Sequence, residues 1–330
     1  MHVLVLGSAG MIGRRLAQAL AQGPSVGGRS ISRLDLVDVV TPPSPPGAVP
    51  TAAHAMDLAD PAAARTLAGL RADVILHLAA VVSGEAEADM AKGYAVNLDG
   101  ARALLEAIRA ERDYHPRLVF ASSLAVFGPP FPARIPDDFA PTPATSYGVQ
   151  KLMVEHLVDD WSRRGILDGV SLRLPTICVR PGAPNRAASG FFSGILREPL
   201  RGEEALLPVG EDVRHYFASP RAAVGFFVHA MGIDTGALGH RRALVMPGVS
   251  ATVGEQIAAL RALAGEDAVR LIRRGPDPAV ERIVAGWAGD YEASRARGLG
   301  FTAEARMEEI LRVHVADEGI GLAGGTRATG

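Results

Sequence analysis

Short apolar runs alternate with helix-period segments through the first half of the chain. This alternation is typical of parallel strands joined by crossover helices. The apolar runs predict six strands, at residues 3–6, 34–37, 53–56, 74–78, 118–122 and 170–174. The periodic segments predict helices at residues 11–21, 61–70, 94–111 and 145–163. We therefore expect an α/β fold with a Rossmann-type, doubly wound parallel sheet.

The second half of the chain is less regular. A stretch rich in Pro, Gly and Arg covers residues 180–210, and helix-period segments follow at 220–231, 253–264 and 304–315. This change in pattern predicts a sheet domain at residues 1–174, and residues 214–246 are predicted to fold back onto that domain. A smaller, mixed region is predicted at 175–213 and 247–318. The Gly-rich residues 319–330 are predicted to form a disordered tail.

Composition narrows the choice of partner. Apolar residues make up 48% of the 330 residues, charged residues make up 21%, and the formal net charge is -2. These values favour a globular protein over a disordered or membrane protein, and give no basic footprint for nucleic acid. Cys178 is the single cysteine and lies in an apolar run, which favours a buried packing residue over a reactive thiol. We expect a cytoplasmic protein with a small-molecule partner, no membrane segment and no metal site.

A glycine turn follows the first predicted strand and opens the first helix, with the sequence GSAGMIG. Gly7 permits the tight turn, Gly10 lets phosphates approach the backbone, and Gly13 lets helix and strand pack closely. The N–H groups that open the helix, including those of Met11 and Ile12, are available to an anion. The motif predicts a dinucleotide-binding site.

Asp38 ends the second predicted strand, where a carboxylate can accept hydrogen bonds from both hydroxyls of an adenosine ribose. Its charge would repel a 2'-phosphate, which favours NAD over NADP. Two alternatives remain: Asp38 as a strand-ending turn residue, and NADP binding through the upstream Arg29 and Arg33. The next strand ends contribute further expected cofactor contacts, namely Asp57, Leu58, Leu78, Ala79 and Ala80, whereas His77 is expected to be structural.

Tyr147 and Lys151 lie one turn apart on one helix face. An adjacent ammonium favours the phenolate and would bring the Tyr147 pKa down from about 10 toward that of a general base. Tyr147 would then accept the hydroxyl proton of an alcohol while hydride departs, and Lys151 would also reach the nicotinamide ribose. A chance surface pair is the alternative for this spacing taken alone.

The segment Phe120–Gly128, FASSLAVFG, places two serines at the end of the fifth strand, at the edge where parallel sheets bind ligands. With the glycine turn, the block His77–Ala80 and the Tyr-Lys pair in the same order, the chain over residues 1–310 resembles the extended short-chain dehydrogenase/reductases, the NAD-dependent epimerase/dehydratase family. The resemblance implies that residues 1–174 bind NAD and that the smaller region binds substrate.

The resemblance also implies roles for individual residues. Ser123 would orient the substrate, and Tyr147 would contact it as the base. Ser122 would lie against the cofactor, and Asn97 would fix backbone and water near the site. Pro175 would pass over the nicotinamide amide. Ser83 would face the substrate from the opposite wall.

Two segments, HLAAVVSGEAEAD at 77–89 and RHYFASPRAAVG at 214–225, are similar to those of the D-erythronate dehydrogenases, which oxidise C2 of a four-carbon sugar acid. We therefore predict NAD-dependent oxidation of a 2-hydroxy sugar acid. Asn185 and Arg186, or Arg214, are expected to hold its carboxylate; the alternative is that Arg186 and Arg214 are solvated surface arginines. The alternatives are a nucleotide-sugar epimerase or dehydratase of the same family and a non-enzymatic NAD-binding regulator.

The helices at 94–111 and 145–163 carry apolar residues on more than one face, so each can bury a second stripe. Relatives in the family pair these two helices across a two-fold axis. We predict a homodimer that uses this surface, with Leu104, Ile108, Leu152, Met153, Leu157 and Trp161 among its apolar side chains.

Overall fold

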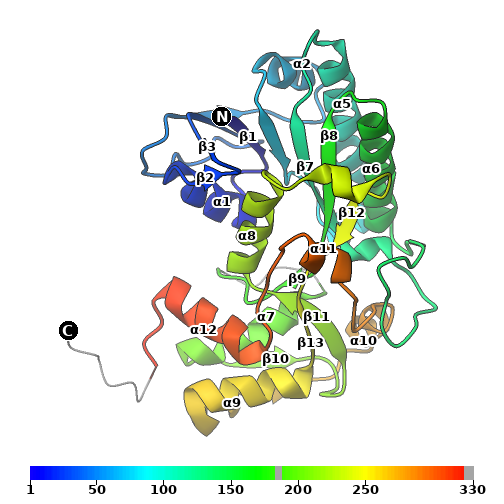
Figure 1. Cartoon of the computed structure of the whole chain (residues 1–330). Helices are drawn as coiled ribbons and strands as arrows, with labels where there is room; N and C mark the ends of the chain where they lie inside the picture. The colour runs from blue at the N-terminus through cyan, green and yellow to red at the C-terminus, as the bar shows by residue number, and fades with distance from the viewer. Residues whose placement is uncertain (183–187, 323–330) are drawn as a thin grey trace.

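A parallel sheet of seven strands forms the upper part of the molecule in Figure 1. The computed structural model describes residues 1–182 and 188–322. The strands lie in the order β12-β8-β7-β6-β1-β4-β5, and every neighbouring pair is parallel. The order reverses between β1 and β6, which confirms the predicted Rossmann-type α/β fold. The strands are β1 (His2–Leu6), β4 (Arg33–Asp38), β5 (Thr51–Ala55), β6 (Val74–His77), β7 (Arg117–Ser123), β8 (Asp168–Leu174) and β12 (Ala243–Val245).

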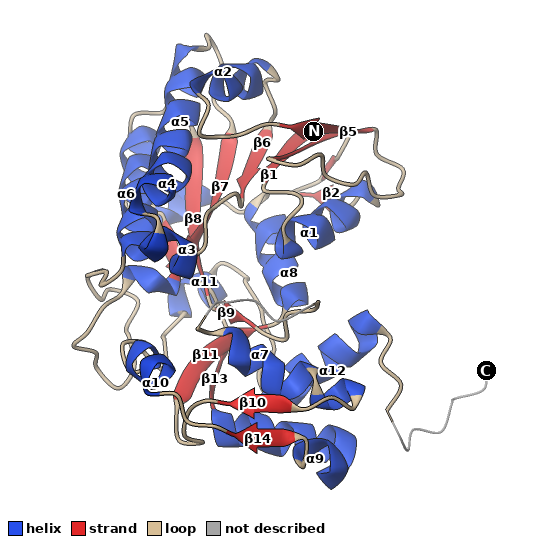
Figure 2. Cartoon of the chain, turned by 180° about the vertical axis from the view of Figure 1, so that it is seen from behind, coloured by secondary structure: helices blue, strands red, loops and turns tan. Residues whose placement is uncertain are grey.

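Helices cover both faces of this sheet, because successive strand residues point to opposite sides. Val3 and Val5 pack with the helices of one face, and Leu4 and Leu6 with those of the other. The first face carries α1 (Met11–Ala21) and α8 (Pro220–Ala230), and the second carries α2 (Pro61–Gly69), α5 (Gly100–Ala110) and α6 (Ser146–Arg163). Figure 2 shows the two layers from behind.

The predicted helix at 94–111 differs from the observed one. Two short helices, α3 (Ser83–Ala88) and α4 (Met90–Tyr94), come first, and the segment Ala95–Asp99 is π-helical before α5 begins. The wider turn contains Asn97, whose side chain bonds to the backbone of Val81 instead of facing solvent. Such π turns occur frequently at functional sites.

The smaller region lies at the carboxyl edge of the main sheet (Figure 1). It has its own core, in which Phe192, Phe217 and Leu260 are fully buried. A mixed sheet joins β9 (Thr176–Ile177), β11 (Arg214–Ala218) and β13 (Val249–Thr252), and a parallel pair joins β10 (Ala205–Leu207) to β14 (Ile272–Arg274). Its helices are α7 (Gly190–Arg197), α9 (Val253–Val269), α10 (Pro278–Val284), α11 (Ser294–Gly298) and α12 (Met307–Glu318).

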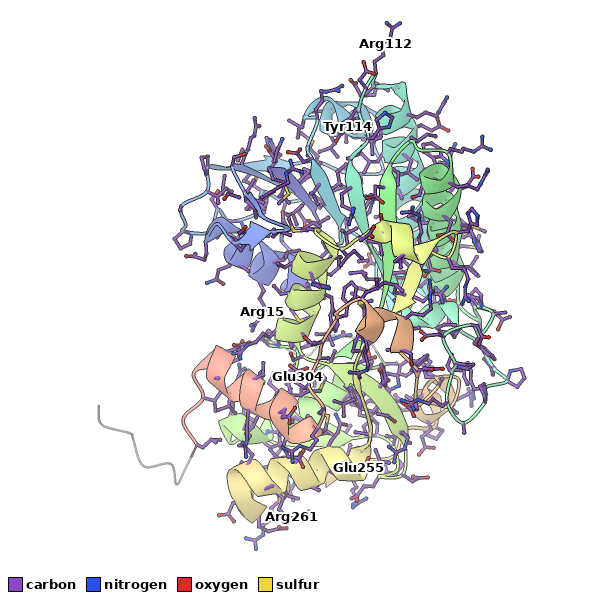
Figure 3. All side chains as sticks on the ribbon, viewed as in Figure 1. Arg15, Arg112, Tyr114, Glu255, Arg261 and Glu304 are labelled. Carbon is purple, nitrogen blue, oxygen red and sulfur yellow. The ribbon has the colours of Figure 1, made fainter. Side chains whose placement is uncertain are left out.

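The chain passes between the two parts more than once. After β11 in the smaller sheet, α8 and β12 return to the main sheet, and β13 then leaves it again. Polar contacts join the parts: Arg15 on α1 pairs with Asp317 and Glu318 on α12, and the Ser219 hydroxyl donates to Glu304 at 2.5 Å. Arg15 and Glu304 are labelled in Figure 3. The remaining strands, β2 (Ser25–Val26) and β3 (Arg29–Ser30), form a small hairpin. The predicted tail at 319–330 lies mostly outside the described residues.

The surface predicted for dimer formation is less apolar than the sequence indicates. Leu104, Ile108 and Trp161 pack into the core beneath α5 and α6. Met153 is exposed on α6, and Leu152 and Leu157 are half-buried. Within the described ranges, no helix has the length and apolar character needed to span a membrane, and no group of three or more potential metal ligands occurs.

Candidate active site

The residues predicted for cofactor binding and catalysis gather at the carboxyl edge of the main sheet. Gly7 follows β1, Asp38 ends β4, and Leu78 follows β6. Ser123 ends β7, and Pro175 lies between β8 and β9. In open α/β sheets ligands bind at this edge, near the strand-order reversal. The fold therefore brings together residues that are far apart in the sequence.

The glycine turn is packed too tightly for side chains at two of its positions. Gly7 has a φ of +84°, and a Cβ there would lie 2.5 Å from the Ala79 nitrogen. A Cβ on Gly13 would lie 2.1 Å from the Gly7 carbonyl oxygen. Gly10 is exposed and begins α1 without a side-chain cap. No side chain of residues 1–182 or 188–322 caps the N–H groups that follow, those of Met11 and Ile12 among them. This arrangement fits a dinucleotide pyrophosphate.

Asp38 stands beside this turn. Its Oδ2 accepts from the Ala9 backbone N–H and its Oδ1 from the Val39 N–H, both at 2.8 Å. The carboxylate is thus held at the tip of β4, where a ribose of the dinucleotide would lie. Arg33 instead pairs with the buried Asp35, and Arg29 pairs with Asp73. Of the other expected cofactor contacts, Asp57 is exposed and Leu58 is buried, while Leu78, Ala79 and Ala80 are half-buried.

Close packing of α6 brings Tyr147 to Ser123. The turn Leu124–Val126 follows β7, and a Cβ on Gly148 would lie 2.1 Å from the Ala125 carbonyl oxygen in that turn. Thr145 caps α6 by accepting from the Gly148 N–H at 3.1 Å. The Lys151 ammonium lies 5.6 Å from the centre of the Tyr147 ring. Ser123, Tyr147 and Lys151 therefore form one cluster.

The expected direction of the Tyr147 pKa shift is wrong. Burial raises the pKa of Tyr147 to about 12, while hydrogen bonding by Ser123 and the charge of Arg180 act to lower it. Burial also lowers the pKa of Lys151 to about 7, so that its own positive charge is disfavoured. The sequence spacing does not reveal this desolvation, which affects the charged forms of both groups.

A buried acid that we did not single out from the sequence lies one turn beyond Lys151. Glu155 Oε1 accepts from the Ser122 hydroxyl at 2.5 Å, and Oε2 accepts from Arg173 at 2.7 Å. Its charge acts to raise the Lys151 pKa, against the effect of burial. The Ser122 hydroxyl is therefore turned toward α6. The helical spacing of Tyr147, Lys151 and Glu155 was the available sequence signal.

Asn97 links three segments near the cluster. Its Oδ1 accepts from the Val81 N–H at 2.8 Å, and its Nδ2 donates to the Val81 carbonyl at 3.0 Å and to Gln150 Oε1 at 2.8 Å. His77 is buried beneath the site, packs edge-on against Phe120, and has no hydrogen bond to its ring nitrogens from the described residues. Burial lowers the pKa of His77 to about 3. It is a neutral packing residue.

The expected substrate contacts are dispersed. Ser83 is exposed at the start of α3, and Asn185 and Arg186 lie outside the described residues. Arg214 is exposed at the start of β11, where it pairs with Glu255 at 3.3 Å, whereas the end of that strand pairs with β9. The structure thus does not bring Arg214 to the Tyr147 cluster. Arg180, which does act on Tyr147, has no periodic pattern around it that would have identified it.

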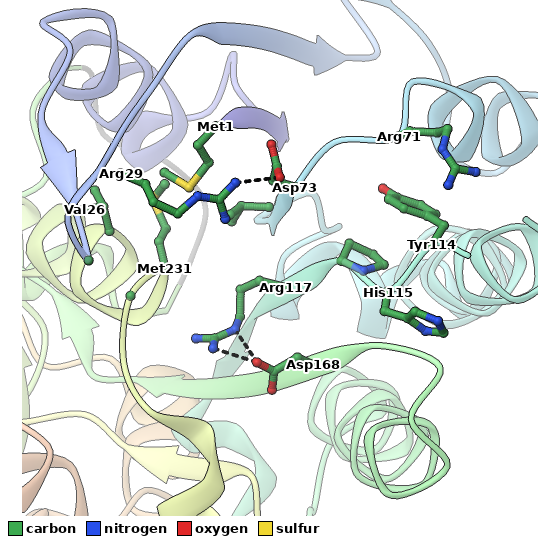
Figure 4. A pocket seen from close by; sticks show the side chains of 14 residues that line it. Met1, Val26, Arg29, Arg71, Asp73, Tyr114, His115, Arg117, Asp168 and Met231 are labelled. Carbon is green, nitrogen blue, oxygen red and sulfur yellow. Dashed lines mark hydrogen bonds and ion pairs between the residues drawn. The ribbon is translucent and has the colours of Figure 1, made fainter. Parts of the chain in front are cut away.

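A pocket of about 530 Å³ lies at the opposite, amino edge of the main sheet (Figure 4). Two arginines in its wall are paired within the wall itself: Arg29 with Asp73 at 2.7 Å, and Arg117 with Asp168 at 2.6 Å. None of the predicted cofactor or catalytic residues lines it. A third lining arginine, Arg71, pairs with Glu111 outside the wall. The pocket also lies at the edge where such sheets do not bind their cofactors.

The family model for the NAD dependent epimerase/dehydratase family matches residues 3–223, which span the glycine turn, Asp38, the serines and the Tyr-Lys pair. The chain belongs to this family. The predicted family is thereby confirmed, and the family description agrees with the predicted cofactor, NAD.

Two curated relatives of this family member match over nearly their whole length. The D-erythronate dehydrogenase of Cupriavidus necator is 44% identical over 324 residues, covering 97% of this chain and 99% of the relative. The D-erythronate dehydrogenase of Haemophilus influenzae is 38% identical over 312 residues, covering 94% and 98%. Both names agree with the narrower resemblance in segments 77–89 and 214–225.

Solved structures show the same fold. A structure from Agrobacterium tumefaciens, named a nucleoside-diphosphate-sugar epimerase, is 56% identical, with a TM-score of 0.95 over 98% of this chain and 96% of that one. An L-threonine dehydrogenase from Cupriavidus necator is 23% identical, with a TM-score of 0.81 over 96% of this chain and 100% of that one, a likeness of fold.

Proposed function

We propose that this family member is an NAD-dependent dehydrogenase that oxidises D-erythronate, or a closely related 2-hydroxy sugar acid, at C2. The observation that carries the proposal is the near full-length match to two D-erythronate dehydrogenases. The cluster of Ser123, Tyr147 and Lys151 at the sheet edge supports it, because these groups suit proton abstraction from an alcohol.

In this mechanism the Ser123 hydroxyl binds and orients the C2 hydroxyl of the substrate. Tyr147 accepts the hydroxyl proton, and the charge of Arg180 acts to stabilise the negative charge on its phenol oxygen. Lys151, whose ammonium lies 5.6 Å from the centre of the Tyr147 ring, contributes only when it is protonated. Bound NAD supplies the hydride acceptor, so that loss of hydride from C2 and of a proton from the hydroxyl gives the 2-keto acid, NADH and a proton. Glu155 opposes the effect of burial on Lys151, because its charge acts to raise the Lys151 pKa.

The test is a screen of purified protein with NAD against four- to six-carbon sugar acids and nucleotide sugars. Steady accumulation of NADH with D-erythronate, read by nicotinamide absorbance, is the expected result. Interconversion of a nucleotide sugar without net NADH, together with no reaction on any four-carbon sugar acid, would contradict the proposal.

A nucleotide-sugar epimerase is the second candidate, favoured by the name of the Agrobacterium structure at 56% identity. Such an enzyme would use the same cluster but return the hydride to its substrate. Arg214–Ala218 reads RHYFA here, whereas the nucleotide-sugar members usually carry Arg-Asp-aromatic at this place. This difference supports the dehydrogenase. A purely NAD-binding regulator is less well supported, because all three residues of the cluster are present.

We propose a homodimer formed through α5 and α6. The exposed Met153 and the half-buried Leu152 and Leu157 support this surface. A monomeric mass by sedimentation at micromolar concentration would contradict it. We also propose a cytoplasmic location, which the single cysteine favours because disulfide-rich chains belong to oxidising compartments.

A further inference from the structure

Among the described residues, three hydrogen bonds fix Arg180 at the start of the smaller region. Its Nε donates to the Ile177 carbonyl at 3.2 Å, and its backbone N–H donates to the Ser193 hydroxyl at 3.0 Å. Its carbonyl accepts from Arg197 at 2.8 Å. Strand β9 and helix α7 therefore hold both its backbone and the base of its guanidinium.

The charge of Arg180 is uncompensated within residues 1–182 and 188–322. No Asp or Glu of that part of the chain forms an ion pair with its guanidinium, although burial lowers its pKa. The adjacent Arg197 is buried and pairs with Glu198 at 2.5 Å, so this acid is already engaged. A desolvated guanidinium without a carboxylate is costly unless an anion binds to it. The local excess of positive charge fits an anionic ligand.

The strand register brings Arg180 toward the catalytic cluster. Ser123 at the end of β7 pairs with Leu174 at the end of β8, and Arg180 Nε bonds to Ile177, three residues beyond Leu174. Arg180 acts to lower the pKa of Tyr147, and Tyr147 acts in turn on Arg180. In a 2-hydroxy acid, the carboxylate carbon is bonded directly to the carbon that carries the reacting hydroxyl. A substrate whose hydroxyl faces Tyr147 therefore presents its carboxylate on the atom next to the reacting carbon.

We propose that Arg180 binds the substrate carboxylate in the site formed by Ser123, Tyr147 and Lys151. This inference rests on the proposed function and assigns the carboxylate contact to Arg180 in place of Arg214. Arg214 is exposed and already paired with Glu255. A guanidinium is suited to the task because its fork of donors matches a carboxylate in two parallel hydrogen bonds.

The experiment compares D-erythronate with its uncharged amide, D-erythronamide, in the wild-type enzyme and in Arg180→Met and Arg180→Lys. Arg261→Met is the matched control, since Arg261 is an exposed arginine on α9 that pairs with Glu266 (Figure 3). NAD binding is measured separately by fluorescence titration. The ratio of kcat/KM for the acid to that for the amide is the deciding quantity, because a general folding defect lowers both values together.

In Arg180→Met we expect kcat/KM for D-erythronate to fall about 100-fold or more, as when one partner of a buried charge pair is removed. The acid-to-amide ratio falls with it, while NAD binding stays within about threefold. Arg180→Lys keeps part of the preference because its ammonium acts as a point charge. Arg261→Met behaves as the wild type.

Two failures can be told apart. If the wild-type enzyme oxidises D-erythronate but Arg180→Met keeps its preference for the acid, the Arg180 assignment is overturned and the proposed function stands. Loss of that preference in Arg214→Ala with Arg180→Met unaffected would also overturn it. If the wild-type enzyme acts on no sugar acid, the proposed function fails, and the carboxylate assignment fails with it.

Discussion

Asp38 accepts a hydrogen bond from the backbone N–H of Ala9 at 2.8 Å, so the carboxylate at the end of β4 is tied directly to the glycine turn. A charge held there repels a 2'-phosphate on the ribose. The wild-type enzyme should therefore use NAD much better than NADP. In Asp38→Asn, which keeps an accepting oxygen but removes the charge, the ratio of the two kcat/KM values should shrink by about tenfold or more. Equal efficiency with both cofactors in the wild type would refute this role.

Tyr147→Phe removes the phenol oxygen with little change in volume. If Tyr147 is the general base, kcat should fall by about a hundred- to ten-thousand-fold. NAD binding should be retained, because the fold of the glycine turn does not depend on this oxygen. Stopped-flow and steady-state rates of NADH formation measure kcat, and fluorescence titration measures NAD binding. A variant that keeps most of its turnover would remove Tyr147 from the mechanism.

Lys151→Met should stabilise the cofactor-free protein. Burial lowers the pKa of Lys151 from 10.5 to about 7, so between these values the unfolded chain binds more protons than the folded one. Stability of the wild type therefore rises with pH across this window, and the cost of the buried amine is complete below pH 7. We expect the variant to gain about 1–3 kcal/mol in free energy of unfolding at pH 7, and less toward pH 10.

Urea unfolding at pH 7 and at pH 10 measures this difference. NADH formation by Lys151→Met should be nearly abolished, as expected where a functional group is kept at the expense of stability. A variant less stable than the wild type at pH 7, or a difference that is the same at both pH values, would contradict the argument.

Gly13→Ala should weaken NAD binding and destabilise the fold, because its Cβ would meet the Gly7 carbonyl oxygen at 2.1 Å. Gly225→Ala is the matched control: it lies within α8 and a Cβ there meets nothing within 4 Å. Alanine at that position should be neutral or stabilising by about 0.5–1 kcal/mol. Calorimetric NAD titration and thermal unfolding compare the two. Equal NAD affinity in both variants would show that the close approach at Gly13 is unimportant.

Hydrophobic periodicity predicted the main sheet well. All six strands expected from apolar runs lie in it, and α1 has the predicted bounds, because burial on both faces leaves a strong pattern in the sequence. β12 was not predicted: it is only Ala243–Val245, too short for a periodic signal. The strands of the smaller sheet were not predicted either, and β9 is only Thr176–Ile177.

The site was predicted where local spacing determines geometry. Tyr147 and Lys151 lie on the same helix face because they are four residues apart. Asp38 was expected at the carboxyl edge of the sheet because it ends a predicted strand. The pKa values of Tyr147 and Lys151 depend on surroundings supplied by distant segments, so spacing could not give their direction. Arg180 reaches the cluster only through the tertiary packing of β9 and α7, which no local pattern encodes.

The pairing of β12 with β8 has a consequence for biosynthesis. Residues 175–242 separate the two strands, so β8 emerges from the ribosome well before the strand that covers its outer side. Until then a row of backbone donors and acceptors at β8 remains open to pairing with other chains. A nascent or proteolysed chain that ends before Ala243 would leave the outer edge of β8 unpaired. A chain that extends past Val245 can pair that edge with β12. Aggregation of truncated chains should therefore depend sharply on whether these few residues are present.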